Sequence, residues 1–281
     1  MSSNGFKNTN KGVSCQNVIV PTYDTDVAQQ LYTDIMARSD MATGITRLAK
    51  NLKSIFEADR EEAVYRQSGK LVTDRLQRSS LTARVFEKKI QPGEKFDTAV
   101  FVLVDESGSM RGGKSVAAKL CVIGLAEAFE KVHIPLYVMG FTDANYGNKA
   151  VHRHYITWNN SRKNRQKLLQ IEGRQGNFDG YAIRTATEII KKKQAVHKLL
   201  IVISDGEPAS EFYPNWEDGI MDTKMAVQEG NRIAPVVGVL IGSENPTQHR
   251  EMYGANFLHC SNPNDMFKGI AKAIEKQIRS W

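Results

Sequence analysis

The chain contains the segment Ala99-Val-Phe-Val-Leu-Val-Asp-Glu-Ser-Gly-Ser-Met110, in which an apolar run gives way abruptly to a polar loop. A short apolar run bounded by polar residues is typical of a strand that is buried on both faces, as in a parallel sheet. Asp105, Ser107 and Ser109 then alternate through a loop whose Gly108 makes a tight curl possible. The pattern predicts three oxygen-bearing side chains gathered at the tip of a buried strand.

One carboxylate and two hydroxyls suit Mg²⁺ or Mn²⁺, because these hard cations prefer oxygen ligands in octahedral geometry and usually retain water. A helix is predicted from about Ser115 to Lys131, and its positive end would favour an anion beside the loop. We therefore expect a cation at this loop, with one coordination position left for a carboxylate.

A rival pattern overlaps the first one. The stretch Gly108-Ser-Met-Arg-Gly-Gly-Lys-Ser115 satisfies G-x-x-x-x-G-K-[ST], the phosphate loop of nucleotide-binding ATPases. In that interpretation Lys114 contacts phosphate, Ser115 holds Mg²⁺ and Asp205 assists it. A phosphate loop normally follows its strand almost directly, whereas three residues separate Val104 from the first glycine here. Nucleotide binding and hydrolysis is therefore the alternative function.

Composition favours a soluble globular protein with one large domain and an appendage, since 41% of the 281 residues are hydrophobic and 25% are charged. The apolar runs are too short to span a bilayer, and the polar start Met1–Lys7 lacks the apolar core of a signal peptide. We expect a cytoplasmic protein without membrane contact. Three cysteines without C-x-x-C spacing are expected to be reduced thiols.

Part of the net charge of +7 lies in residues 149–174, which hold seven Lys or Arg and one Glu. A basic stretch can bind nucleic acid, but here no aromatic residues are interleaved in the way that nucleic-acid motifs require. A solvated basic face is the favoured interpretation, and a nucleic-acid partner is not expected.

The six histidines lack the spacing of a zinc site, and no serine stands in G-x-S-x-G.

The sequence divides into three regions. Residues 1–22 are polar and rich in turn formers, which predicts a flexible tail. Residues 23–96 form a helical region, with helices expected at 24–38, from about 45 to near Gly69 and at 68–78. In residues 97–281 strands and helices alternate, which predicts an α/β fold with a doubly wound, mostly parallel sheet of the Rossmann-like kind.

The elements expected in this last region are the following. Strands are predicted at 99–104, 134–141, 154–158, 199–203, 236–241 and 257–259, and helices at 115–131, 161–171, 181–193, 222–233 and 264–279.

Ligands of such sheets bind beyond the carboxyl ends of the strands. Asp105, Thr142, Asp143 and Asp205 each follow a predicted strand, and the loop Gly176-Asn-Phe-Asp-Gly180 precedes a predicted helix. We therefore expect these segments to converge on one rim.

At these positions the chain resembles a known family. Asp105-Glu-Ser-Gly-Ser109, the loop with Asn177 and Asp179, and Ile203-Ser-Asp-Gly206 look like the metal-ion-dependent adhesion site of von Willebrand factor A (VWA) domains. In that family a divalent ion is held by an Asp, two Ser, a residue of a second loop and an Asp of a third, and a partner's carboxylate often completes the shell. The resemblance implies metal ligands at Asp105, Ser107, Ser109, Asn177 or Asp179, and Asp205.

More narrowly, an ordered series of segments between residues 46 and 210 resembles the CobT-type subunit of aerobic cobalt chelatases. These segments are Gly69–Arg78, Asp97–Val100, Ser107–Gly112, Gly140–Thr142, Asn177–Gly180 and Val202–Pro208. The resemblance implies a subunit without catalysis of its own, an adaptor that pairs with a MoxR- or CobS-type AAA+ ATPase. It would bring the ATPase's remodelling work to a client, which for CobT is a chelatase that inserts cobalt into a corrin ring.

The chain is short for such a chelatase subunit and lacks a long acidic region, so the resemblance does not identify the client. A carboxylate of the client protein is expected at the metal. The candidates for partner contact are the residues beside the metal ligands, namely Glu106, Met110, Thr142, Asp143 and Phe178.

Overall fold

The computed structural model of the chain describes residues 13–22, 25–63, 65–66, 70–71, 73, 76, 86–87, 98–144, 149–206, 208–242, 246–260 and 263–279. Among these residues, no helix combines the length and the apolar character that crossing a membrane requires.

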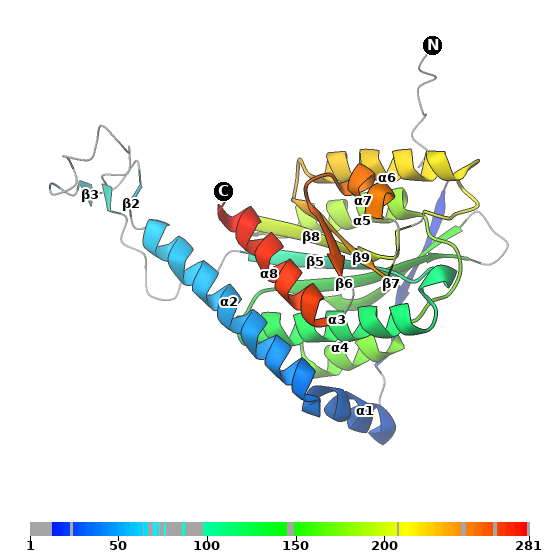
Figure 1. Ribbon diagram of the computed structural model, residues 1–281, viewed down its shortest axis with the longest axis horizontal. Coiled ribbons are helices and arrows are strands. Elements are labelled where there is room, and N and C mark those ends of the chain that lie inside the picture. Colours follow the sequence, from blue (N-terminus) through cyan, green and yellow to red (C-terminus); the bar gives the residue numbers. More distant parts are fainter. Residues whose placement is uncertain are drawn as a thin grey trace, which may run out of the picture.

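A seven-stranded sheet forms the centre of the fold (Figure 1). Its spatial order is β1 (Ser14–Ile19), β7 (Lys149–Thr157), β6 (Leu136–Asp143), β5 (Thr98–Asp105), β8 (His197–Ser204), β9 (Val236–Ile241) and β10 (Phe257–Cys260). All neighbours run parallel except β6 and β7, which are antiparallel. The predicted α/β fold with a mostly parallel sheet is confirmed.

Helices cover both faces of this sheet, as Figure 1 shows. One face carries α1 (Asp26–Ala37), α2 (Ser39–Ala63), α3 (Gly113–Lys131), α4 (Arg162–Gln166) and α8 (Pro263–Arg279); the other carries α5 (Asp179–Lys191), α6 (Trp216–Gly230) and α7 (Pro246–Tyr253). Two short 3-10 helices, η2 (Gly108–Met110) and η3 (Lys167–Gln170), complete the main fold.

The central strand β5 is buried along its whole length, because its side chains alternate between two cores. Val100, Val102 and Val104 pack in the core beneath α3, whereas Phe101 and Leu103 pack in the core beneath α5 and α6. This two-sided burial explains the uninterrupted apolar run in the sequence, and it places Asp105 at the carboxyl edge of the sheet.

The N-terminal segment is partly a strand, which corrects the prediction of a flexible tail over residues 1–22. Ser14–Ile19 forms β1, which pairs in parallel with β7 at the edge of the sheet. The side-chain oxygen of Asn17 lies 2.9 Å from His154 Nε2, and Val20 is fully buried. These partners lie more than a hundred residues away, so local polarity could not reveal them. Residues 1–12 lie outside the described part.

The two long N-terminal helices are confirmed, and they pack on the main fold. Met41, Ile45, Leu48 and Leu52 of α2 are buried at helical spacing, and α2 contacts α3 and α8. The predicted helix at 68–78 is wrong at Lys70–Leu71, which forms β3; most of its other residues lie outside the described set. β3 pairs through β4 (Phe86–Glu87) with β2 (Tyr65–Arg66) in a small antiparallel sheet.

Two further elements differ from the prediction. Helix α6 begins at Trp216 rather than at residue 222, because Asn215 caps it by accepting from the Asp218 N–H at 2.9 Å. Helix α7, over Pro246–Tyr253, was not predicted. Strand β7 is longer than the predicted 154–158 and lies inside the sheet, since β1 covers its outer edge.

Candidate metal centre

The loop after β5 curls back on itself. Asp105 is 1% exposed, and its Oδ1 accepts from the Ser107 backbone N–H at 2.7 Å. The hydroxyl oxygens of Ser107 and Ser109 are hydrogen-bonded to each other at 2.9 Å, and the chain continues as η2. The alternating residues of the sequence pattern therefore gather their side chains on one side of the loop.

The loop after β8 meets this first loop. Ser109 Oγ donates to Asp205 Oδ1 at 3.0 Å, and Ser204 Oγ donates to Asp105 Oδ2 at 3.1 Å. Gly206, at φ +105°, turns the chain so that its N–H donates to Ser204 Oγ at 3.0 Å. Sequence reasoning had missed Ser204, although a hydroxyl at the end of the strand that precedes Asp205 was the available signal.

The loop before α5 contributes two residues with different contacts. Asn177 donates from Nδ2 to Asp105 Oδ2 at 3.3 Å, and its Oδ1 accepts from the Ala209 N–H at 2.7 Å. Its amide thus ties together the three loops. Asp179 is the first residue of α5 and is 3% exposed, and its Oδ2 has no hydrogen-bond partner among the described residues.

The electrostatics of the cluster favour a cation. Burial, followed by the negative charge of Asp205, raises the pKa of Asp105 to about 7. Burial and the charge of Asp105 raise the pKa of Asp179 well above its ordinary value. Lys114 Nζ lies 2.7 Å from Asp205 Oδ2 and supplies one positive charge.

The donor set fits a hard divalent ion. Carboxylate and hydroxyl oxygens are the ligands that Mg²⁺ and Mn²⁺ prefer, and Asp179 Oδ2 is a buried oxygen without a donor. Within the described part of the chain, no three His, Cys, Asp or Glu side chains alone are grouped so that they could hold a metal. A cation would therefore depend on the hydroxyls of Ser107 and Ser109 as well as on the carboxylates.

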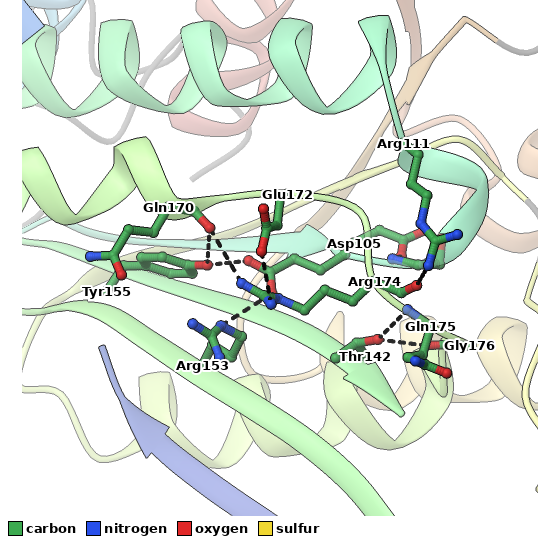
Figure 2. A network of polar contacts seen from close by, with 12 residues as sticks. Asp105, Arg111, Thr142, Arg153, Tyr155, Gln170, Glu172, Arg174, Gln175 and Gly176 are labelled. Atoms are coloured by element: carbon green, nitrogen blue, oxygen red, sulfur yellow. Dashed lines mark hydrogen bonds and ion pairs between the residues drawn. The ribbon is translucent and has the colours of Figure 1, made fainter. Parts of the chain in front are cut away.

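A buried charge cluster supports the first loop from behind. Glu106 is fully buried, and its Oε2 lies 3.2 Å from Arg174 Nε and 3.5 Å from Arg153 Nε. The Tyr155 hydroxyl donates to Glu106 Oε1. Figure 2 shows the Arg174 side chain extended toward this cluster, with Glu172 and Tyr155 beside it.

The five residues predicted to contact a partner are buried in the structure, and their contact with a partner stays a prediction. Glu106, Met110, Thr142, Asp143 and Phe178 are all at most 7% exposed. Their partners lie inside the protein: Thr142 Oγ1 donates to the Gly176 carbonyl at 3.0 Å, and the ring of Phe178 stacks on Phe212 at 4.7 Å. They support the loops, whereas Ser109, Arg111 and Gly112 are exposed at the rim.

The geometry does not favour the alternative nucleotide site. The backbone N–H groups of Gly108, Met110 and Arg111 donate to carbonyl oxygens of the protein, and the Ser115 hydroxyl donates to the Gly112 carbonyl. A phosphate loop needs such amide groups free to surround the phosphates. Lys114, the expected phosphate ligand, is paired with Asp205.

The basic stretch 149–174 is not a continuous solvated face. Arg165 is 8% exposed and pairs with Glu127 at 2.7 Å. Arg153 and Arg174 pair with Glu106. Because these cations are engaged inside the protein, the stretch presents less positive charge to a partner than its sequence indicates.

Part of the chain is similar to a known protein family. Residues 85–171 match the family described as "Cobalamin biosynthesis protein CobT VWA domain". The protein YojO of Bacillus subtilis (strain 168), whose name describes it as uncharacterized, is 30% identical over 212 residues, or 69% of this chain. The chain spans about a third of the length of YojO, since the match covers 33% of it.

Two solved structures share the fold at low identity. The pilus adhesin SpaC from Lactobacillus rhamnosus GG, in its open conformation, matches with a TM-score of 0.51 and 13% identity, over 67% of this chain and 30% of SpaC. The PilB minor pilin from Streptococcus sanguinis matches with a TM-score of 0.50 and 12% identity, over 69% of this chain and 64% of PilB. At such identities the likeness concerns the fold alone. Over residues 85–171 the chain is similar to the CobT VWA domain, and the mostly parallel sheet with loops at its carboxyl edge agrees with that similarity.

Proposed function

We propose that this protein binds a divalent cation, Mg²⁺ or Mn²⁺, and uses it to hold a carboxylate of a partner protein. The observation that carries the proposal is the hydrogen-bonded cluster of Asp105, Ser107, Ser109 and Asp205, which come from two loops about a hundred residues apart. Buried carboxylate groups whose negative charge is not balanced by nearby positive groups are stabilised by a bound cation.

Each residue has a role in this proposal. Asp105, Ser107 and Ser109 hold the ion, and Asp205 contributes directly or through water. Asp179 supplies the oxygen of the second loop, because its Oδ2 lacks a donor, while Asn177 positions Asp105 and the third loop through its two side-chain contacts. A partner's carboxylate reaches the ion from the rim of the sheet, where Ser109 is exposed.

We propose further that the protein is a non-catalytic adaptor for a MoxR- or CobS-type AAA+ ATPase, and that it helps to remodel a client or to insert a metal into it. The similarity to the CobT VWA domain supports this partner. A cytoplasmic location agrees with the three cysteines, Cys15, Cys121 and Cys260, which form no disulfide.

The test combines metal titration with capture of the ATPase. Asp105→Ala is compared with wild type and with Asp34→Ala, which removes an exposed aspartate from α1. Calorimetric titration with MgCl₂ is expected to show binding by wild type and Asp34→Ala and no binding by Asp105→Ala. Affinity capture of a MoxR- or CobS-type AAA+ ATPase is expected to follow the same order and to disappear in EDTA.

Circular dichroism checks that Asp105→Ala is folded. Asp105→Asn keeps the size of the side chain, so it repeats the test without leaving a cavity at this buried position. Capture of the ATPase by a folded Asp105→Asn variant, at the wild-type level and in EDTA, would contradict the proposal.

A further inference from the structure

Lys114 occupies a position that a helix by itself disfavours. It lies in the first turn of α3, which begins at Gly113 and contains no acidic residue in that turn. A cation there opposes the positive end of the helix dipole. Its ammonium group instead finds a partner across the site, since Nζ lies 2.7 Å from Asp205 Oδ2.

The contact is partly enclosed. The Asp205 side chain is 3% exposed and that of Lys114 is 36% exposed. The aliphatic stem of Lys114 runs past Gly242, which has φ +67° and follows β9; a Cβ placed on Gly242 would lie 3.5 Å from Lys114 Cγ and 3.7 Å from Cε. The stem is thus bounded by the end of β9, and the ammonium group is directed onto the carboxylate.

The contact with Lys114 engages Asp205, which is a predicted metal ligand. Asp205 Oδ1 accepts from Ser109 and Oδ2 accepts from Lys114, so both of its oxygens are engaged. The ammonium group also partly neutralises a cluster in which the charges of Asp105 and Asp205 repel each other. A divalent ion that binds there would meet a positive charge already in place.

We propose that Lys114 is a built-in counter-ion of this site, which stabilises Asp205 in the metal-free protein and competes with the divalent cation for it. The inference rests on the metal binding proposed above and adds a determinant of its affinity. The ion pair lowers the affinity for the cation, and binding of the cation in turn weakens the hold of Asp205 on the ammonium group, because the two effects are reciprocal.

The test is Lys114→Met, which keeps the length of the stem and removes the charge. The matched control is Lys131→Met, the same change at an exposed lysine in the last turn of the same helix. Titration with MgCl₂ and MnCl₂ at low ionic strength is expected to show at least about tenfold tighter binding by Lys114→Met, and less than about twofold change for Lys131→Met. Lys114→Arg, which keeps the charge, is expected to bind like wild type.

A second readout needs no metal. In EDTA, Lys114→Met is expected to unfold at a lower temperature than wild type, because Asp205 loses its partner, and saturating Mg²⁺ is expected to reverse that order. Equal or weaker Mg²⁺ binding by Lys114→Met, with wild type still binding, would overturn the counter-ion role and leave the metal site standing. Absence of binding by all four proteins would overturn the metal site and this inference together.

Discussion

Arg174 holds Glu106 at two points: its Nε donates to the buried carboxylate at 3.2 Å, and its backbone N–H donates to the Glu106 carbonyl at 2.6 Å. Glu106 directly follows Asp105, and Arg174 lies just ahead of the loop that carries Asn177 and Asp179. Next to it, the Gly108 N–H donates to the Gln175 carbonyl, which bonds the two loops along their backbones. Figure 2 shows the Arg174 side chain extended toward Tyr155 and Glu172. The first and second loops are therefore held as one unit by a buried charge.

We expect Arg174→Leu to lower the free energy of unfolding by about 2 kcal/mol, because the buried Glu106 loses its shorter ion pair and keeps the longer one with Arg153 and the hydrogen bond from Tyr155. Urea denaturation measures the change. The double variant Glu106→Gln with Arg174→Leu is expected to recover part of the loss, since position 106 then no longer carries a buried charge. Equal stability of Arg174→Leu and wild type would contradict this role.

The two candidates of the second loop can be separated. Asp179→Asn is expected to weaken Mg²⁺ binding by more than about tenfold, because it removes a carboxylate ligand. It is not expected to lower stability in EDTA, because the same change removes a buried carboxylate that repels Asp105. Asn177→Ala is expected to lower the free energy of unfolding by about 1–2 kcal/mol, because the Ala209 N–H and Asp105 lose a partner. Calorimetric titration and urea denaturation distinguish them, and the opposite pattern would make Asn177 the ligand.

Asp143 makes stability depend on pH. Burial raises its pKa from 3.8 to about 6, and the nearby Glu211 adds to the effect while a hydrogen bond from Ser210 opposes it. Between these two values the folded state holds more protons than the unfolded state, so its contribution to stability falls as pH rises from about 4 to about 6. We expect Asp143→Asn to gain about 1–2 kcal/mol relative to wild type across this window. Parallel pH dependences of the two proteins in urea denaturation would show that Asp143 is not responsible.

The attachment of α1 depends on a hydroxyl. Tyr32 donates to Glu127 Oε1 of α3 at 2.6 Å, and Arg165 Nε lies 2.7 Å from the same oxygen. Tyr32→Phe is expected to lower the free energy of unfolding by about 1 kcal/mol, because one hydrogen bond to a charged group is lost while the ring stays packed. Thr33→Ala, which changes an exposed neighbour on the same helix, serves as the control in thermal unfolding.

The alternative nucleotide site predicts ATP turnover that Lys114→Ala abolishes. Since the N–H groups of Gly108, Met110 and Arg111 already donate within the protein and Lys114 is paired with Asp205, we expect no saturable binding of a fluorescent ATP analogue in the presence of Mg²⁺, by wild type or by the variant. Saturable binding by wild type that Lys114→Ala removes would establish the nucleotide site and set aside the metal-adaptor function.

Patterns that depend on neighbouring residues were predicted well. The apolar run from Ala99 to Val104 predicted a strand covered on both faces, because a strand in that position needs apolar side chains at every residue. The alternating Asp105, Ser107 and Ser109 predicted converging oxygens, and the curl of the loop brings them together. The amphipathic spacing of Ile45, Leu48 and Leu52 predicted the helix that packs on this fold.

Features that depend on distant partners were predicted poorly. The polar strand β1 is stable because β7 provides its hydrogen bonds, and nothing in its own composition indicates that pairing. Thr142 and Phe178 stand beside the site in sequence but point into the protein, since side-chain direction follows from packing. Lys114 and Asp205 are 91 residues apart in sequence, and their contact turned an apparent phosphate-binding lysine into the partner of a carboxylate.

The amino-acid sequence by itself determined the kind of protein, an α/β domain with oxygen-bearing loops at one edge of a parallel sheet, because periodicity and strand-end residues are local properties of the chain. Only the tertiary structure decided which of those oxygens are bonded, which lack a donor and which side chains reach the surface. These properties are set by groups that folding brings together from remote parts of the chain, and their energies depend on the burial that results.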